Sequence, residues 1–410
     1  MRVRDIFGEN FKCVCGKEHS VPSIEIIESS IKEVPNVFPE AFFVADRNTA
    51  LLVNLPGGRY FVFEEGRPLA TMENVKKIAK VSKDFPEIVS VGSGSLTDIT
   101  RYTAFLFGKS FSCIPTAPSV DAYTSSVAPI LVNGVKKTFK AIPPRRIFID
   151  IDILKNAPVD LLRAGIGDII AKIPARMDWT LSNVLNDEHI CDFVWKDIKD
   201  LLKEILAKSR YILERDESAV RMLMDAQLVS GINMVIVGNS RPASGAEHMI
   251  SHLIEMFHEE RGEIPPLHGL SVMIGVFVSA KAFELIMEEF FLPKEHFSLE
   301  ERRKELLEMF SKEKVEEFLK TYEGKKIPTM INLKIIKESL KGLYVEYFPQ
   351  LQRVLNILDV QSMLKKYSKN FLMKIVRLAN TIRARFTVLD VLDGLNLLKP
   401  FSEYVFNEIE

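Results

Sequence analysis

The stretch Glu87–Phe107, EIVSVGSGSLTDITRYTAFLF, joins a strand pattern, a glycine turn and a helical pattern. Glu87–Val91 predicts a strand, and Leu96–Phe107 carries apolar residues at helical spacing. Between them, the glycines of Gly92-Ser93-Gly94-Ser95 allow close backbone approach, and the N–H groups of the following helix favour a phosphate. Because Thr97 replaces the third glycine of the usual dinucleotide fingerprint, a tight turn without a ligand is the alternative.

Similar strand patterns flank this stretch, at Ala41–Ala45, Phe111–Ile114 and Arg146–Ile151. Their alternation with helical patterns predicts a mostly parallel, Rossmann-like sheet covered by helices. Asn133-Gly134 predicts a hairpin turn between strands at 128–132 and 135–141. After Ile153, apolar residues recur at spacings of three and four almost to the end. We therefore expect an α/β domain over residues 1–154 and an all-α domain over 155–410.

Polar residues follow the predicted strands, at the edge where open α/β sheets bind ligands. Asp46 is well placed to accept the ribose hydroxyls of an adenosine, or else to cap the turn that follows with Asn48 and Thr49. The segment 115–126 is rich in small hydroxylated residues and prolines, which predicts a rigid polar loop at the same edge. Within it, Asp121 is a candidate to bind a polyol, or else a turn carboxylate.

The segment Ser244–Gly269 holds four of the seven histidines. His248 and His252 are four residues apart and share one face of a predicted helix, which Ser244 and Glu247 would start as a capping box. His268 follows a Pro-Pro break, on a segment that can fold back towards the pair. Imidazoles brought together in this way suit Zn, Ni or Fe, although a histidine pair alone is also common at partly buried surfaces.

A metal held by imidazoles also needs an anionic ligand. Asp168, at the start of a predicted helix after Gly165-Ile166-Gly167, is the best carboxylate candidate, and a helix cap is the alternative. A second group, Cys13, Cys15 and His19, has residue types found in small zinc sites. No fourth ligand is apparent nearby, however, and Gly16-Lys17 predicts the turn of a hairpin.

Composition indicates an ordinary soluble globular protein, with 47% hydrophobic and 27% charged residues. A net charge of -1 argues against nucleic acid as the main partner. The N-terminus lacks the apolar core of a secretory signal, and the longest apolar run, Leu267–Ala280, is too short to span a bilayer. Four scattered cysteines fit a reducing compartment, so we expect a cytoplasmic protein without a membrane span.

Several short motifs occur together in an order that resembles the iron-containing alcohol dehydrogenase superfamily, which includes glycerol dehydrogenase and dehydroquinate synthase. They are Asp46-Arg47-Asn48-Thr49, Gly92-Ser93-Gly94-Ser95, Pro115-Thr116-Ala117-Pro118-Ser119, Gly167-Asp168, Glu247-His248 and Leu267-His268-Gly269. The Cys-x-Cys-Gly-x-x-His start, the histidine run and Arg383-x-Arg385-Phe386-Thr387 are most similar to the bacterial NAD(P)-dependent sn-glycerol-1-phosphate dehydrogenases. The resemblance implies an N-terminal nucleotide-binding domain, a helical metal-binding domain and an active site in the cleft between them.

The resemblance also implies a role for particular residues. Asp168, His248 and His268 would bind the metal; His252 and Asp121 would contact substrate as catalytic residues, beside Asp168. The dinucleotide would be held by Asp46, Gly92, Ser93, Gly94, Ser95, Leu96, Thr116, Ala117, Pro118, Ser119 and Ser125.

These implications predict a reversible reduction of dihydroxyacetone phosphate to sn-glycerol 1-phosphate by NADH or NADPH, a step of phospholipid metabolism. A divalent Zn, Ni or Fe ion would polarise the ketone oxygen. Asp46 favours NAD, whereas Arg47 beside it would tolerate NADP. A glycerol or small-alcohol dehydrogenase and a noncatalytic metal or nucleotide sensor are the alternatives. We expect a homo-oligomer, and no Lys or Arg can be assigned to the substrate phosphate from the sequence.

Overall fold

The computed structural model describes residues 7–132, 135–288, 292–328 and 331–407. The chain forms two compact units that alternate along the sequence. The first unit is Met1–Ile169 with Phe193–Asn239, and the second is Ile170–Asp192 with Ser240–Glu410. The sequence prediction placed a single boundary after residue 154, whereas the helices between 155 and 239 are shared between the two units.

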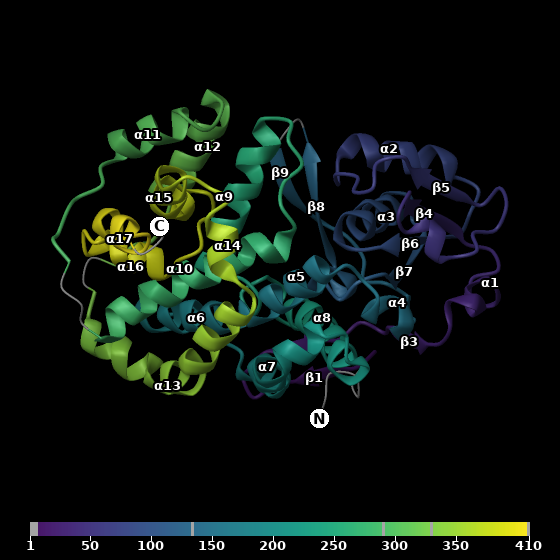
Figure 1. Cartoon of the computed structure of the whole chain (residues 1–410), viewed down its shortest axis with the longest axis horizontal. Helices are drawn as coiled ribbons and strands as arrows, with labels where there is room; N and C mark the ends of the chain where they lie inside the picture. Colours follow the sequence, from purple (N-terminus) through teal and green to yellow (C-terminus); the bar gives the residue numbers. More distant parts are fainter. Residues whose placement is uncertain (1–6, 133–134, 289–291, 329–330, 408–410) are drawn as a thin grey trace. The chain divides into compact units, whose positions relative to one another are not determined.

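A six-stranded sheet forms the centre of the first unit (Figure 1). Its strands pair in parallel throughout, in the order β3-β10-β7-β6-β4-β5. Their bounds are β3 Glu25–Glu28, β4 Phe42–Asp46, β5 Tyr60–Phe63, β6 Glu87–Gly92, β7 Ser110–Pro115 and β10 Arg146–Ile149. The predicted Rossmann-like sheet is therefore confirmed. The last strand ends before residue 151 because the Asp150 carboxylate caps a helix by accepting the N–H of Asp152.

Alternation of side chains divides the sheet into two buried faces. Phe43, Ala45, Val89 and Val91 point to one face, where they pack in a core with Phe38 and other apolar residues. The helix α3, Gly94–Leu106, packs against β6 and β7. Burial on both faces is the reason that these strands have nearly continuous apolar sequences.

The remaining elements of the first unit are two hairpins and several helices. The β1–β2 and β8–β9 hairpins are antiparallel, and the turn residues Asn133-Gly134 lie outside the described residues. The bounds are β1 Asn10–Lys12, β2 Glu18–Ser20, β8 Val127–Val132, β9 Val135–Lys140, η2 Ile31–Glu33, α1 Val34–Val37, η3 Ala50–Leu52, α2 Met72–Val81, η4 Asp121–Thr124, α4 Ile151–Lys155, α5 Val159–Ile170, α7 Asp192–Leu213 and α8 Glu217–Val237.

Every regular element of the second unit is helical over the residues described, which confirms the predicted all-α region. The helices are α6 Lys172–Asn186, α9 Ala246–Glu260, α10 His268–Glu288, α11 Leu299–Leu307, α12 Lys312–Glu323, α13 Leu333–Ile357, α14 Val360–Leu364, α15 Lys369–Leu378, η5 Ala379–Thr381, α16 Val388–Gly394 and α17 Leu398–Tyr404. Helices α9 and α10 lie side by side (Figure 1). Their approach is so close that a Cβ on Gly275 would lie 2.1 Å from the Glu247 carbonyl oxygen.

Two helices, α8 and α10, are long and apolar enough to cross a membrane by length and composition alone. Helix α10 continues beyond the apolar run at 267–280 to Glu288 and is 21 residues long. In the most apolar windows of α8 and α10, 72% and 83% of the residues are buried inside the structure, as in core helices of soluble proteins. The absence of a membrane span stays a prediction.

Candidate metal centre and nucleotide site

The start of α9 sets the position of the first histidine pair. The helix begins at Ala246, so the predicted start just before His248 is confirmed. The predicted Ser244–Glu247 capping box is wrong: Gly245 is the N-cap, and the Glu247 carboxylate accepts the Gly245 N–H at 2.6 Å. The Asp178 carboxylate accepts the next N–H, that of Ala246, at 2.7 Å. A Cβ on Gly245 would lie 2.4 Å from that carboxylate, which explains why glycine occupies this position.

Three histidines meet on α9 and at the first residue of α10. The ring centroids of His248 and His252 are 6.0 Å apart, and that of His268 lies 5.3 Å and 5.5 Å from them. The segment after the Pro-Pro break therefore folds back to the pair, as expected. Ligand atoms of His248 and His268 lie within 4.8 Å of each other, a separation that allows both to bind one ion. Their role as metal ligands stays a prediction.

A buried glutamate that the sequence analysis missed orients these rings. Glu255 is 2% exposed, and its carboxylate lies 2.6 Å from His268 Nδ1 and 3.5 Å from His252 Nδ1. The Glu247 carboxylate lies 2.9 Å from His248 Nδ1. A carboxylate on Nδ1 fixes the imidazole with Nε2 available to a metal. The signal was present in the sequence, since Glu255 follows His248 by two helical turns and so shares its face.

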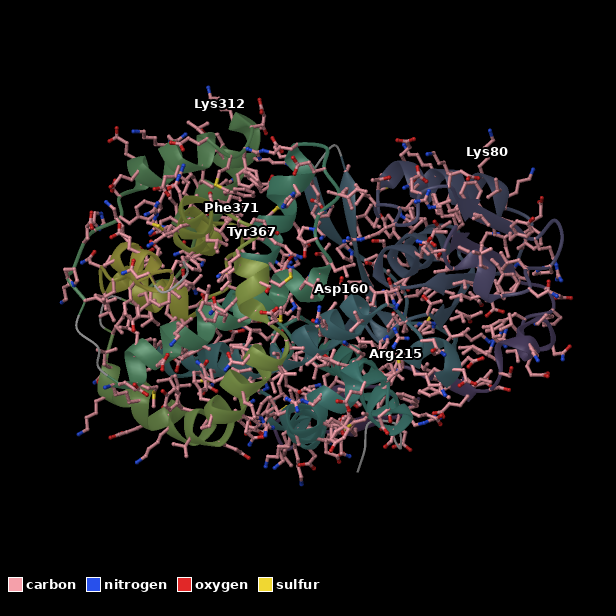
Figure 2. All side chains as sticks on the ribbon, in the orientation of Figure 1. Lys80, Asp160, Arg215, Lys312, Tyr367 and Phe371 are labelled. Carbon is pink, nitrogen blue, oxygen red and sulfur yellow. The ribbon has the colours of Figure 1, made fainter. Side chains whose placement is uncertain are left out.

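Two stacked aromatic side chains, Tyr367 and Phe371, add to the burial around Glu255. The ring of Tyr367 stacks on that of Phe371 with centroids 5.2 Å apart, and both are labelled in Figure 2. Burial, with a smaller contribution from the Glu255 charge, raises the pKa of the Tyr367 phenol to about 12. Tyr367 is therefore neutral at physiological pH, and the charges beside the histidines are carboxylates and arginines.

The charges of two arginines, Arg383 and Arg385, interact with the carboxylates beside the histidines. Burial lowers the pKa of Arg383. The negative charge of Glu255 opposes that shift, so Arg383 interacts electrostatically with the histidine–glutamate cluster. Burial, reinforced by Arg241 and Arg383, lowers the pKa of Arg385 to about 9. Arg385 donates hydrogen bonds to Ser240 and Ser244, and Arg241 donates to Glu188. Within the described residues, the Arg383 side chain makes no hydrogen bond.

Asp168 lies in the first unit, fully buried near the end of α5. The predicted helix start at this residue is wrong, because α5 begins nine residues earlier, at Val159, and passes through both glycines. Gly165 is needed inside the helix, since a Cβ there would lie 2.0 Å from the Pro118 carbonyl oxygen. The Asp168 carboxylate accepts the Asp121 N–H at 3.1 Å, and the Asp121 carboxylate accepts the Ser230 hydroxyl at 2.8 Å. The structure therefore joins the two predicted substrate-binding carboxylates.

The predicted nucleotide residues gather at one edge of the sheet, because the carboxyl ends of β4, β6 and β7 are neighbours. A Cβ on Gly92 would lie 2.3 Å from Leu96 Cδ1, and Ser93 is the N-cap of α3. The segment Thr116–Ser119 follows β7 directly. Asp46 caps its own turn, accepting the N–H groups of Asn48 and Thr49 at 2.9 Å through Oδ1. In the sequence prediction, capping of this turn was the alternative to ribose binding. The second carboxylate oxygen of Asp46, Oδ2, takes part in neither of these two hydrogen bonds.

A buried arginine that the sequence analysis missed holds the loop beside this edge. Arg101 is fully buried and donates hydrogen bonds to the carbonyl oxygens of Ala122, Tyr123 and Val127. These bonds shape η4 and Ser125, the predicted nucleotide-binding serine that follows it. Burial raises the pKa of its neighbour Asp98 to about 7.

Comparison with known proteins identifies relatives of this chain. Residues 59–158 match the family model described as iron-containing alcohol dehydrogenase. The glycerol-1-phosphate dehydrogenase [NAD(P)+] of Halalkalibacterium halodurans is 35% identical over 283 residues, which cover 64% of this chain and 71% of that protein. The enzyme of the same name from Bacillus subtilis is 40% identical over 185 residues, 45% of this chain and 47% of that protein.

Solved structures share the fold at low identity. A probable glycerol dehydrogenase from Sinorhizobium meliloti matches with a TM-score of 0.55 and 18% identity, covering 93% of this chain and 97% of that one. An iron-containing alcohol dehydrogenase from Thermotoga maritima matches with a TM-score of 0.56 and 13% identity, covering 91% and 98%. These structures show the fold alone. The Halalkalibacterium halodurans relative, at 35% identity over 71% of its length, shows that the chain belongs to the glycerol-1-phosphate dehydrogenase [NAD(P)+] family of enzymes.

Proposed function

We propose that the protein catalyses the reversible, metal-dependent reduction of dihydroxyacetone phosphate to sn-glycerol 1-phosphate by NADH or NADPH. The observation that carries the proposal is the cluster of His248, His252, His268 and Glu255 with Arg383 in its field. The names of the sequence relatives supply the substrate class. The cluster offers metal ligands and a proton donor, and the arginine offers a phosphate ligand.

The donor set of the second unit fits a divalent metal of the Zn, Ni or Fe type. His248 and His268 have carboxylates at Nδ1, which leaves the Nε2 atoms for coordination. When bound, such an ion supplies Lewis acidity to the ketone oxygen of the substrate. Two imidazoles leave the ion short of an anionic ligand, a role that Asp168 would fill.

One local feature supports Asp168 as the third ligand. A buried carboxylate in the last turn of α5 faces the negative end of the helix dipole, and a cation relieves that repulsion.

His252 is proposed to carry the proton. Reduction of a ketone leaves negative charge on its oxygen, and an acid within reach completes the alcohol. The His252 side chain is 14% exposed, which gives it access to solvent protons, and the Glu255 carboxylate lies 3.5 Å from its Nδ1. In the oxidative direction the neutral imidazole accepts the same proton. Asp121 holds Asp168 in place through its backbone N–H and is expected to bind a substrate hydroxyl.

The dinucleotide is proposed to lie along the edge formed by β4, β6 and β7. N–H groups of the first turn of α3 would bind the pyrophosphate, because they have no partners within the helix and the dipole favours an anion. The Asp46 Oδ2 atom would accept a hydrogen bond from a ribose hydroxyl, while Oδ1 would keep its hydrogen bonds with the N–H groups of the turn. Thr116, Ser119 and Ser125, all buried, would line the nicotinamide half of the cofactor.

The test compares dihydroxyacetone phosphate with dihydroxyacetone in the wild type, Arg383→Ala and Arg383→Lys. Loss of a charge-assisted phosphate contact costs about 2–3 kcal/mol, so Arg383→Ala should raise KM for the phosphorylated substrate roughly 30–100-fold. Turnover of dihydroxyacetone should change little. Arg383→Lys keeps the positive charge but lacks the planar guanidinium that can donate two parallel hydrogen bonds. Its KM for the phosphorylated substrate should therefore be intermediate. Arg210→Ala, at an exposed position of α7, is the control.

Other outcomes distinguish the alternatives. Equal effects of Arg383→Ala on both substrates would reject its role in binding phosphate. Faster turnover of glycerol than of glycerol 1-phosphate would identify a small-alcohol dehydrogenase. NADH binding without turnover of any polyol would identify a sensor, and the proposed reaction would then be rejected.

A further inference from the structure

The N-terminal hairpin brings two thiols and an imidazole together, and none of these residues belongs to the histidine cluster described above. Cys13 and Cys15 lie in the turn between β1 and β2, and His19 lies in β2. Gly16 makes this turn possible through its positive φ of 84°. Ligand atoms of the three residues all lie within 4.8 Å of one another, and the Cys15 Sγ atom is 3.2 Å from His19 Nε2.

These distances suit a tetrahedral ion. Zinc bonds of about 2.3 Å to sulfur and about 2.0 Å to nitrogen place neighbouring S and N ligands about 3.6 Å apart. The backbone N–H of Cys15 also points to Cys13 Sγ at 3.5 Å, a contact that stabilises a thiolate. Two thiols and one imidazole leave one position of the tetrahedron to be filled.

The chain brings another cysteine to this hairpin. Phe193, in the first turn of α7, packs on Phe11 of β1 with ring centroids 4.8 Å apart. Phe11 is the register partner of His19, and their rings are 5.6 Å apart. Cys191 precedes Phe193 by two residues, so their Cα atoms cannot be more than about 7.6 Å apart. Cys191 is 1% exposed, which keeps its thiol away from bulk water.

Helix α8 holds α7 and the hairpin together within the first unit. It contacts β2, and its Asn233 side chain donates a hydrogen bond to the Val194 carbonyl oxygen at 3.0 Å. The start of α7 is therefore fixed beside the hairpin by Phe193 on one side and Val194 on the other. Because Cys191 is two residues from Phe193, the same anchor limits how far Cys191 can lie from the hairpin.

We propose that Cys13, Cys15, His19 and Cys191 form a closed tetrahedral zinc site. Three thiolates and an imidazole are a ligand set that selects zinc, and binding releases the thiol protons to solvent. With four protein ligands, no position is left for substrate or water, so the site is structural. It ties the first strands of the chain to the start of α7, far along the sequence. The site does not depend on the proposed reaction.

The test is a cobalt titration of the full-length protein, because Co²⁺ bound to thiolates gives charge-transfer absorption that histidine–carboxylate sites lack. The wild type should show this absorption with tetrahedral d–d bands, and Zn²⁺ should displace both. Cys15→Ser and Cys191→Ser should each lower the thiolate absorption by about a third or abolish it, in a Cys₃His site. Cys113→Ser is the matched control, since Cys113 lies buried in β7, and its spectrum should equal that of the wild type.

Three results would overturn the site. No thiolate absorption in the wild type would reject it even if a variant fails to fold. An unchanged spectrum in Cys191→Ser would reject Cys191 as a ligand. A disulfide between any two of these cysteines, found by mass spectrometry of the protein alkylated without reductant, would reject metal binding. Because the absorption reports thiolates alone, failure of the dehydrogenase proposal leaves this test unaffected.

Discussion

Because α9 and α10 are in close contact, the single methyl group added by Gly275→Ala provides a test of the proposed metal centre. A Cβ on Gly275 would lie 2.1 Å from the Glu247 carbonyl oxygen and 2.6 Å from the Glu247 Cα, both backbone atoms that cannot rotate away. Ordinary contacts begin near 3.4 Å. In Gly275→Ala the two helices must therefore separate by about 1 Å, and overpacking of this kind costs about 1–3 kcal/mol.

The same displacement should weaken metal binding, because α9 carries His248 next to Glu247 and α10 begins with His268. Metal sites tolerate deviations of about 0.2 Å in ligand distances, so a movement of about 1 Å should reduce affinity at least tenfold. We expect Gly275→Ala to lower the Tm of the metal-free protein by about 3–10 °C. Calorimetric titration with Zn²⁺ or Ni²⁺ should show the loss of affinity.

Gly342→Ala is the control for the intrinsic effect of alanine. Gly342 is an exposed residue inside α13, and a Cβ there meets nothing within 4 Å. Alanine should stabilise the protein there by about 0.5–1 kcal/mol, because it loses less backbone entropy on folding. The two substitutions are thus expected to act in opposite directions. If Gly275→Ala matched Gly342→Ala in both Tm and metal affinity, the inferred helix contact would be refuted.

Three further substitutions test other contacts. Glu255→Gln should lower metal affinity about 10–100-fold by removing the anion at His268 Nδ1, measured by metal competition, whereas Glu263→Gln, which removes a similar partner from His258, should leave it unchanged. Asp46→Ala should cost about 1 kcal/mol through the lost cap and raise KM for NADH more than for NADPH; equal changes would argue against ribose binding. Burial raises the pKa of Asp98 from 3.8 to about 7, so its stabilising contribution is complete below about pH 4 and is lost as pH rises to about 7; urea unfolding should show this slope in the wild type and not in Asp98→Asn.

Local sequence patterns were sufficient to predict the main strands and helices and the residue types of the candidate site. Apolar runs bounded by glycine or proline specified β4, β6, β7 and the helix after the Gly92 turn, because strand and helix periodicities depend only on neighbouring residues. The spacing of His248 and His252 likewise placed both rings on one helix face. The motifs also carried the family resemblance, which the comparisons confirmed.

Contacts between residues far apart in sequence could not be predicted without the packing of the helices. Sequence spacing could not assign the Glu255 carboxylate to His268, place Arg383 near Glu255 or bring the start of α7 to the Cys13 hairpin, since each requires helices to pack. Two local predictions failed for the same reason. Gly165 lies inside α5 because Pro118 approaches it, and Gly245 replaces Ser244 as the cap because Asp178 takes the space that a side chain would fill. Packing against a distant segment outweighed local propensity at both positions.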